Sequence, residues 1–338
     1  MDIDPALVTE RLRRQVERVR VEPDPPADFV SFWQQTLDEL NAIPLDLEVT
    51  LREGTEPAEE GLLVGEWRAT SWGGRRIGGP LVMPADRRGP QWVYGHGYGS
   101  VRAGCERRPQ LARLGFIALG CDARGYNRSR QPGDPAVPGW ILAGIESRER
   151  YILRGAVADT IRAVQVARAL EGADPRRTVL EGGSFSGGTA VLAAPWIADL
   201  AYLAVRVPTF GAYDLRRTLV KRGSGAEINA YMDGLDEADR RALRERLRYF
   251  DAVNAAAHID GIPVTVGLGV SDAVVPGETV AAIYHAIPSP QKELLSFPCS
   301  HTDHPLAAQW SRFTEHIQRR ALALLAARDP ARPDQRRA

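Results

Sequence analysis

The sequence predicts an α/β fold with a mostly parallel central sheet and helices on both faces. Three observations lead to this prediction. After Gly89, short apolar segments typical of buried strands alternate with longer segments of helical periodicity, the order that produces a parallel sheet. Between residues 45 and 84, alternating segments broken by glycine indicate antiparallel strands at one edge. At 338 residues, the chain is also long enough to bury a large core.

The same patterns place the individual strands and helices. The antiparallel edge strands are expected at Leu47–Leu51, Leu62–Trp67 and Gly79–Met83. The strands of the parallel part are expected at Trp92–Tyr94, Phe116–Leu119, Thr178–Leu180, Ala201–Val205, Val264–Leu268 and Leu294–Phe297. The helices between them are expected at Val101–Leu114, Ala156–Leu170, Gly187–Ala198, Gly277–Ala286 and Leu306–Ala327.

Both ends and one internal segment are expected to stand apart from this core. Residues 1–27 are predicted to form an extended N-terminal arm, because they end in a proline-rich run. Asp28 is then expected to be the N-cap of an N-terminal helix with an aromatic face. Residues 28–327 are expected to form a single domain with a polar helical insertion at 213–254, followed by a disordered tail at 328–338.

Composition argues against several classes of function. The 43 basic and 43 acidic residues balance, so we expect neither nucleic acid nor a membrane surface as a partner. The longest apolar runs are far shorter than a membrane span, and residues 1–5 lack the features of a signal peptide. Cys105, Cys121 and Cys299 show no metal-ligand spacing and fit a reducing compartment. A cytoplasmic location without a bound metal is therefore expected.

One serine lies between small residues at the end of an expected strand. Ser184 follows Thr178–Leu180, with Gly182 two positions before it and Ser186 two positions after it. This pattern is typical of a nucleophile elbow, a sharp strand-to-helix turn that projects the serine hydroxyl above the sheet. The flanking residues must be small because the two backbones pass close to each other. A glycine-rich loop without chemistry, or a phosphate cradle at a helix N-terminus, is the alternative; the P-loop lysine is absent.

A serine hydroxyl needs a base to become a nucleophile, and the base needs a group that orients it. In an α/β-hydrolase these follow in the order serine, acid, histidine. Asp272 follows the strand expected at Val264–Leu268, and His301 follows the strand expected at Leu294–Phe297. Order and location therefore predict Ser184, Asp272 and His301 as the catalytic set.

Two nearby residues compete for these roles. His304 lies three residues after His301, but it precedes Pro305 and so is better placed to start the last helix. Asp303 lies too near both histidines in the sequence to come from another strand end.

Acyl transfer also needs hydrogen-bond donors for the developing oxyanion. One donor in this fold is the backbone N–H after the nucleophile, which is that of Phe185. The other comes from the loop after an earlier strand, and Gly95–Gly99 supplies it, with Tyr98 as the expected donor.

With these residues in place, the chain resembles the acetyl xylan esterase and cephalosporin C deacetylase family, carbohydrate esterase family seven. The resemblance extends from about Asp28 to Leu324. The matching segments are Asp28–Trp33, His96–Tyr98, Asp122–Gly125, Tyr151–Gly155, Ala158–Ala163, Gly182–Ser184, Tyr249–Asp251, Gly269–Asp272 and Lys292–Leu294.

The resemblance implies an α/β-hydrolase fold and an esterase that removes acetyl groups from small esters, with acetylated xylo-oligosaccharides and cephalosporin C among the family's substrates. Ser184, Asp272 and His301 match the family's triad, and Tyr98 and Phe185 match its oxyanion hole. No cofactor is implied. The family is cytoplasmic and forms a ring-shaped hexamer, so a homo-oligomer is expected.

Several residues near the site depart from the family pattern. Phe185 and Tyr126 stand where the family has glutamine, and Ser186 stands where it has glycine. Residues that match loop supports or are expected at the pocket are Arg124, Tyr126, Ser186 and Phe210. If the rings of Phe185 and Tyr126 reach the pocket, it suits a more apolar ester better than a hydroxyl-rich sugar. Acyl transfer to an alcohol or amine, and a binding protein without turnover, are the alternatives.

Overall fold

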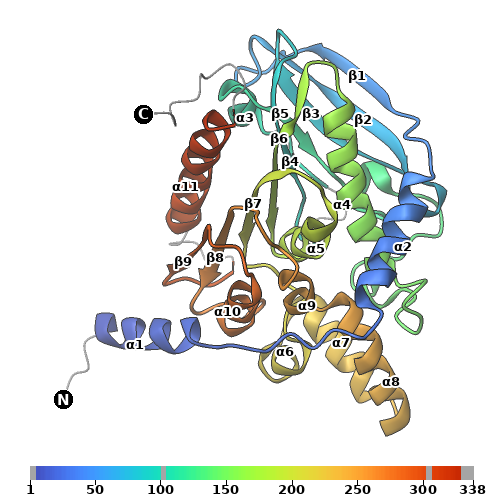
Figure 1. The fold of residues 1–338 in the computed structure, drawn as a ribbon, viewed down its shortest axis with the longest axis vertical. Coiled ribbons are helices and arrows are strands. Elements are labelled where there is room, and N and C mark those ends of the chain that lie inside the picture. Colours follow the sequence, from blue (N-terminus) through green and yellow to red (C-terminus); the bar gives the residue numbers. More distant parts are fainter. Residues whose placement is uncertain (1–4, 100–103, 302–306, 329–338) are drawn as a thin grey trace, which may run out of the picture.

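The computed structural model describes residues 5–99, 104–301 and 307–328. Within these ranges the strands form one sheet of nine, in the order β1-β2-β3-β5-β4-β6-β7-β8-β9 (Figure 1). The strands are β1 (Glu48–Glu53), β2 (Leu62–Ser71), β3 (Arg75–Pro84), β4 (Gly89–Tyr94), β5 (Ile117–Gly120), β6 (Ala173–Gly183), β7 (Leu200–Arg206), β8 (Val264–Gly269) and β9 (Lys292–Phe297). A strand lies at each place where the sequence predicts one, although several are longer.

The sheet is antiparallel at one edge and parallel elsewhere, as predicted. The pairs β1–β2, β2–β3 and β3–β5 are antiparallel, and every pair from β5 to β9 is parallel. The central strands β7 and β8 are buried along almost their whole length, which agrees with their continuous apolar sequence. The carboxyl ends of the parallel strands therefore meet at one edge of the sheet, where ligands bind in such folds.

Helices cover both faces of the sheet (Figure 1). They are α1 (Pro5–Glu17), α2 (Phe29–Asn41), α3 (Pro109–Arg113), α4 (Ile152–Ala169), α5 (Phe185–Ala193), α6 (Tyr213–Leu219), α7 (Gly223–Asp233), α8 (Glu237–Leu247), α9 (Ala252–Ala256), α10 (Gly277–Ala286) and α11 (Ala307–Ala326). Helices α3 and α11 lie on one face, and α4, α5 and α10 lie on the other (Figure 1). The predicted helical insertion is present as α6 to α9, between β7 and β8.

The helix predicted at Val101–Leu114 is much shorter in the structure. Only α3, at Pro109–Arg113, is helical in the described part of this segment; residues 101–103 lie outside the described ranges. Gly104 has a positive φ of 58°, and the backbone N–H of Cys105 donates to the Asp122 carboxylate instead of to a helical carbonyl. Sequence periodicity alone did not reveal this competing acceptor, which is distant in the chain.

The prediction of an extended arm over residues 1–27 is wrong for residues 5–17, which form α1. The prolines begin only at Pro23, so they do not prevent a helix before it. Val16 is 2% exposed and packs on Gly277, the first residue of α10. Residues 19–26 do have no regular secondary structure and lead to α2. The disordered tail predicted at 328–338 lies outside the described residues, except Arg328.

Asp28 stands before α2, as predicted, but its side chain makes no capping hydrogen bond. Its carboxylate accepts hydrogen bonds from the Arg148 guanidinium, at 2.9 Å, and from the Tyr249 hydroxyl. The side chain therefore ties α2 to later segments of the chain. None of the helices in the described ranges combines the length and the apolar character that a bilayer crossing requires.

Substitution Val16→Ala tests the docking of α1 on α10. We expect the free energy of unfolding, measured by urea titration, to fall by about 1–2 kcal/mol, because the change removes buried methyl groups. Leu12→Ala is the control: Leu12 lies in the same helix and is 39% exposed. It should change the free energy of unfolding by less than about 0.5 kcal/mol. Equal effects of the two variants would contradict the docking.

Candidate active site

The turn between β6 and α5 holds Ser184 in a strained backbone conformation. Its φ is 54° and its ψ is −112°, which is rare for a residue with a side chain. The turn is tight because a Cβ atom at Gly182 would lie 2.3 Å from the carbonyl oxygen of Ser186. A Cβ at Gly95, in the loop after β4, would lie 2.5 Å from the Cβ of Ser186. Three segments therefore pass so close together here that only glycine fits at two of the positions.

Backbone hydrogen bonds fix this turn. The N–H of Ser184 donates to the carbonyl of Arg206 over 2.8 Å, and the Ser184 carbonyl accepts from the N–H groups of Gly188 and Thr209. The Ser186 hydroxyl contacts both the N–H and the carbonyl of Gly183, at 3.0 and 3.1 Å. Ser186 therefore supports the turn, which is one of the two roles expected for it.

The loops after β8 and β9 bring an acid and a histidine together. Nδ1 of His301 lies 2.7 Å from Oδ2 of Asp272, so Nδ1–H donates to the carboxylate and Nε2 remains available as an acceptor. The other carboxylate oxygen accepts from the backbone N–H groups of Val274 and Val275, at 2.8 and 2.9 Å. The Asp272 side chain has no exposed surface, whereas the His301 side chain is 16% exposed. Hydrogen bonds on both oxygens thus fix the carboxylate, and its role is to orient the imidazole.

Ser184 and His301 line the same cavity, which has a volume of about 880 Å³. Within the described residues, the Ser184 hydroxyl makes no hydrogen bond with His301; such contacts often tighten only when a substrate binds. Asp272 lies behind the histidine and does not line the cavity. The competing residues Asp303 and His304 lie outside the described ranges.

The loop after β4 is held at Tyr98 from two sides. The hydroxyl of Tyr126 donates to the Tyr98 carbonyl over 2.9 Å. The Tyr98 hydroxyl donates to Glu227 of α7 over 2.9 Å and accepts from the N–H of Ile141. Burial and the nearby Glu227 carboxylate raise the pKa of this hydroxyl, so it remains protonated and donates. Both Tyr98 and Phe185 line the cavity.

Phe185, which lines the cavity, packs against aromatic rings that lie behind it. The ring centroid of Phe185 lies 5.9 Å from that of Tyr126, 5.2 Å from that of Trp140 and 6.0 Å from that of Phe210. Tyr126 and Phe210 have no exposed surface and do not line the cavity. Phe185 is 2% exposed. The Tyr126 ring does not reach the cavity: it packs behind the wall, and its hydroxyl holds the loop after β4. Phe185 does line the cavity, and its effect on the choice of ester stays a prediction.

A comparison with known proteins places this geometry in a family. The sequence pattern of the acetyl xylan esterase (AXE1) family matches residues 11–318. The chain belongs to the acetyl xylan esterase family. It is therefore a carboxylic ester hydrolase with an α/β-hydrolase fold.

Solved structures agree with this assignment. An acetyl xylan esterase from Paenibacillus sp. R4 has a TM-score of 0.78 and 25% identity, over 90% of this chain and 98% of its own. Acetyl xylan esterase 1 from Thermoanaerobacterium sp. JW/SL YS485 has a TM-score of 0.77 and 22% identity, over 96% of this chain and 99% of its own. A cold-adapted esterase from an Arctic intertidal metagenomic library has a TM-score of 0.54 and 17% identity, over 80% of this chain and 97% of its own. The last two show a shared fold.

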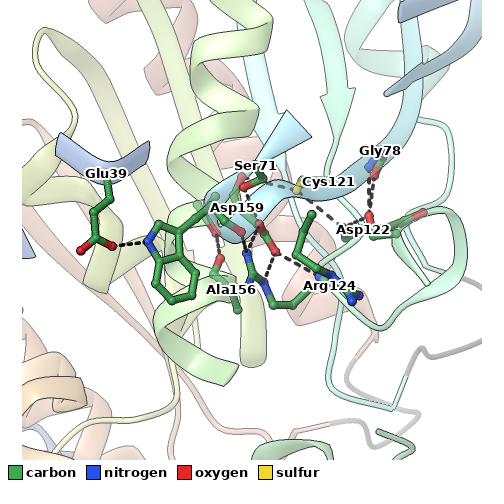
Figure 2. Close-up of polar contacts among 12 residues, drawn as sticks. Glu39, Ser71, Gly78, Cys121, Asp122, Arg124, Ala156 and Asp159 are labelled. Atoms are coloured by element: carbon green, nitrogen blue, oxygen red, sulfur yellow. Dashed lines mark hydrogen bonds and ion pairs between the residues drawn. The ribbon is translucent and has the colours of Figure 1, made fainter. Parts of the chain in front are cut away.

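A buried ion pair supports the wall of this esterase. The Arg124 guanidinium donates to both carboxylate oxygens of Asp159 in α4, at 2.9 and 2.8 Å (Figure 2). The Ser71 hydroxyl donates to the same carboxylate over 2.6 Å (Figure 2). The carbonyl of Arg124 accepts from the indole N–H of Trp140 over 2.9 Å. Arg124 therefore supports the loop after β5, one of the two roles expected for it, and does not line the cavity.

Sequence reasoning missed the charged residues of the cavity wall. Glu227 comes from the insertion, Arg206 ends β7, and Arg108 precedes α3; all three line the cavity. No local signal marks them, because their importance depends on distant segments that face them. In the part of the chain that is described, no group of three or more His, Cys, Asp or Glu side chains is arranged to hold a metal ion.

Asp159→Asn tests the ion pair, because it removes the charge but keeps the shape. It leaves the Arg124 guanidinium buried without a counter-charge, so the free energy of unfolding should fall by about 3–5 kcal/mol in urea titration. The control is Glu48→Gln. Glu48 forms an ion pair with Arg76, and its side chain is 71% exposed. That loss should stay below about 1 kcal/mol. A similar small loss for Asp159→Asn would show that the buried pair stabilises nothing.

Proposed function

We propose that this protein hydrolyses small carboxylic esters, acetyl esters above all, with Ser184 as nucleophile, His301 as base and Asp272 as the group that orients the base. The proposal is carried by one observation: the 2.7 Å contact between His301 and Asp272, beside a cavity that also contains Ser184 in its strained turn. A hydrogen-bonded acid and histidine, beside a half-buried strained serine that lines the same cavity as the histidine, are the parts that acyl transfer requires.

The reaction would proceed in two halves. Nε2 of His301 takes the proton of the Ser184 hydroxyl as its oxygen attacks the ester carbonyl, and the same proton then goes to the departing alcohol. Water next attacks the acyl-enzyme carbonyl and loses a proton to His301; the bond to the Ser184 oxygen then breaks, the acid is released, and His301 returns the proton to Ser184. The Asp272 carboxylate holds the imidazole in place and stabilises the imidazolium that forms in each half.

The oxyanion would be held by the backbone N–H groups of Phe185 and Tyr98. Phe185 is the first residue of α5, where the N–H has no partner within the helix and the helix dipole favours negative charge. The contacts of Tyr126 and Glu227 with Tyr98 support this role, since they hold the loop that carries the second donor.

Two kinds of ester fit the cavity. Two similar solved structures are named acetyl xylan esterases, so acetylated xylo-oligosaccharides are the first candidate, with cephalosporin-type acetyl esters beside them. A bulkier apolar ester is the second, because the cavity of about 880 Å³ is large and is lined in part by Leu111, Val137, Val274 and Phe313. A panel of esters from acetyl to benzoyl, measured against acetylated sugars, separates them.

The cytoplasmic location and the homo-oligomer stay predictions drawn from the sequence and the resemblance. Light scattering on the purified chain would measure the mass of the assembly directly and so test the expected hexamer.

Ser184→Ala should lower kcat for p-nitrophenyl acetate by roughly 10³-fold or more, because the change removes the oxygen that forms the acyl-enzyme. Ser224→Ala is the control: Ser224 also lines the cavity, but its hydroxyl accepts from Arg216 over 3.2 Å. Its kcat should stay within about threefold of the parent value.

A near-normal rate for Ser184→Ala would refute the nucleophile. A serine-reactive phosphonate should label the parent protein and not Ser184→Ala; an unlabelled parent would indicate a binding protein without turnover. Product analysis with an added alcohol acceptor separates hydrolysis from acyl transfer.

Tyr126→Phe tests whether the Tyr126 hydroxyl positions the oxyanion loop. The variant loses the hydrogen bond to Tyr98, so kcat for p-nitrophenyl acetate should fall about tenfold with little change in KM. Tyr202→Phe is the control, since the Tyr202 hydroxyl contacts Thr265 within the sheet, away from the cavity. Both variants should lose about 1 kcal/mol of unfolding free energy, but only Tyr126→Phe should lose kcat. Equal kcat values would assign Tyr126 a purely structural role.

A further inference from the structure

Arg206 places a guanidinium group in the cavity wall beside the candidate nucleophile. It ends β7, and its backbone carbonyl accepts the hydrogen bond from the N–H of Ser184. Its side chain passes close to Gly183, where an added Cβ would lie 3.4 Å from Nε. The guanidinium carbon lies 5.1 Å from the ring centroid of Trp310 in α11. The charge is thus held over an aromatic ring, next to the turn that carries Ser184.

None of the described acidic side chains that line the cavity forms an ion pair with this guanidinium. Glu181 accepts from Arg108 over 2.7 Å and from the Trp92 indole over 2.6 Å. Glu227 accepts from the Tyr98 hydroxyl and from the N–H of Gly139.

Glu106, the remaining acidic side chain of the wall, is exposed. Among the described residues, no carboxylate forms an ion pair or hydrogen bond with Arg206. Two guanidinium groups, those of Arg108 and Arg206, therefore face the single carboxylate of Glu181.

The Arg206 side chain is partly buried, so water screens its charge less than it would at the surface. Burial lowers the pKa of Arg206, and the charge of Arg108 lowers it further, whereas Glu181 raises it. A guanidinium nevertheless remains charged in proteins. Its planar donors match the two oxygens of a carboxylate, and a partly desolvated guanidinium without a counter-ion gains free energy when such an anion binds.

We propose that the ester substrate carries an anionic group, a carboxylate near the scissile bond, and that Arg206 binds it. The proposal rests on the proposed function, because it assigns a substrate class to the same cavity. The carboxylate belongs either to the acyl part or to the alcohol part of the ester, and these two sources are distinguished by experiment.

Two matched pairs of esters test the proposal. For the acyl part, p-nitrophenyl hydrogen succinate is compared with p-nitrophenyl butyrate. For the alcohol part, 3-acetoxybenzoate is compared with 3-acetoxybenzamide. The measured quantity is the ratio of kcat/KM for the anionic ester to that for the neutral ester. Arg206→Gln should lower this ratio about tenfold or more in one pair, because a charge-assisted hydrogen bond is lost. The pair that responds identifies the part of the substrate that carries the anion.

Arg206→Lys keeps the charge but not the planar fork, so it should retain part of the preference that Arg206→Gln loses. Arg107→Gln is the matched control, because Arg107 also lines the cavity but pairs with Glu59 at 3.3 Å. Its ratios should change by less than about threefold. Ratios for Arg206→Gln that equal those of the parent in both pairs overturn the proposal, and so does an equal loss in Arg107→Gln.

The four esters together report on the proposed function separately. If the parent protein hydrolyses none of the four, the proposed function fails, and binding of benzoate and of succinate, measured by calorimetry, then decides the inference. Weaker binding to Arg206→Gln than to the parent supports an anion site at Arg206, and equal binding overturns it.

Discussion

The close approach of β6, α5 and the loop after β4 is the constraint on which the rest of the site depends. Glycine at positions 182 and 95 lets these backbones pass within contact of Ser186. The price is a strained Ser184, at a cost of order 1–3 kcal/mol for such a conformation. Hydrogen bonds to Arg206, Gly188 and Thr209 hold the strain in place. Because Arg206 and Thr209 belong to β7 and the loop after it, the serine is also fixed relative to the neighbouring strand of the sheet.

The loops around this turn are fixed by buried polar contacts. The Arg124–Asp159 pair joins the loop after β5 to α4 (Figure 2). The Trp140 indole donates to the Arg124 carbonyl. From the same loop, Tyr126 reaches the Tyr98 carbonyl. Burying such groups is costly unless every partner is present. The continuous set of contacts from α4 to the cavity wall therefore permits one arrangement of these loops.

The helical insertion takes part in the site through its first turns. Ser224 and Glu227 of α7 line the cavity, and Glu227 binds the Tyr98 hydroxyl. Arg216 of α6 donates to Thr209 and Ser224, so the insertion is bonded to the loop after β7. The N-terminal segment is bonded to the insertion in turn, because the N–H of Asp24 donates to Asn254 over 2.8 Å. The insertion, whose sequence predicts only a polar helical segment, thus completes one wall of the cavity.

The sequence by itself determined the fold class, the place of every strand, and the candidate set of Ser184, Asp272 and His301. Strand periodicity, the elbow pattern and chain order are local or sequential features, so they can be read without neighbours. Tertiary structure alone decided that α1 is a helix docked through Val16, that α3 begins only at Pro109, and that the ring of Tyr126 supports the wall. It also decided that no carboxylate among the described residues pairs with Arg206. These features depend on contacts between residues far apart in the chain, and a local pattern carries no information about which distant group will be adjacent.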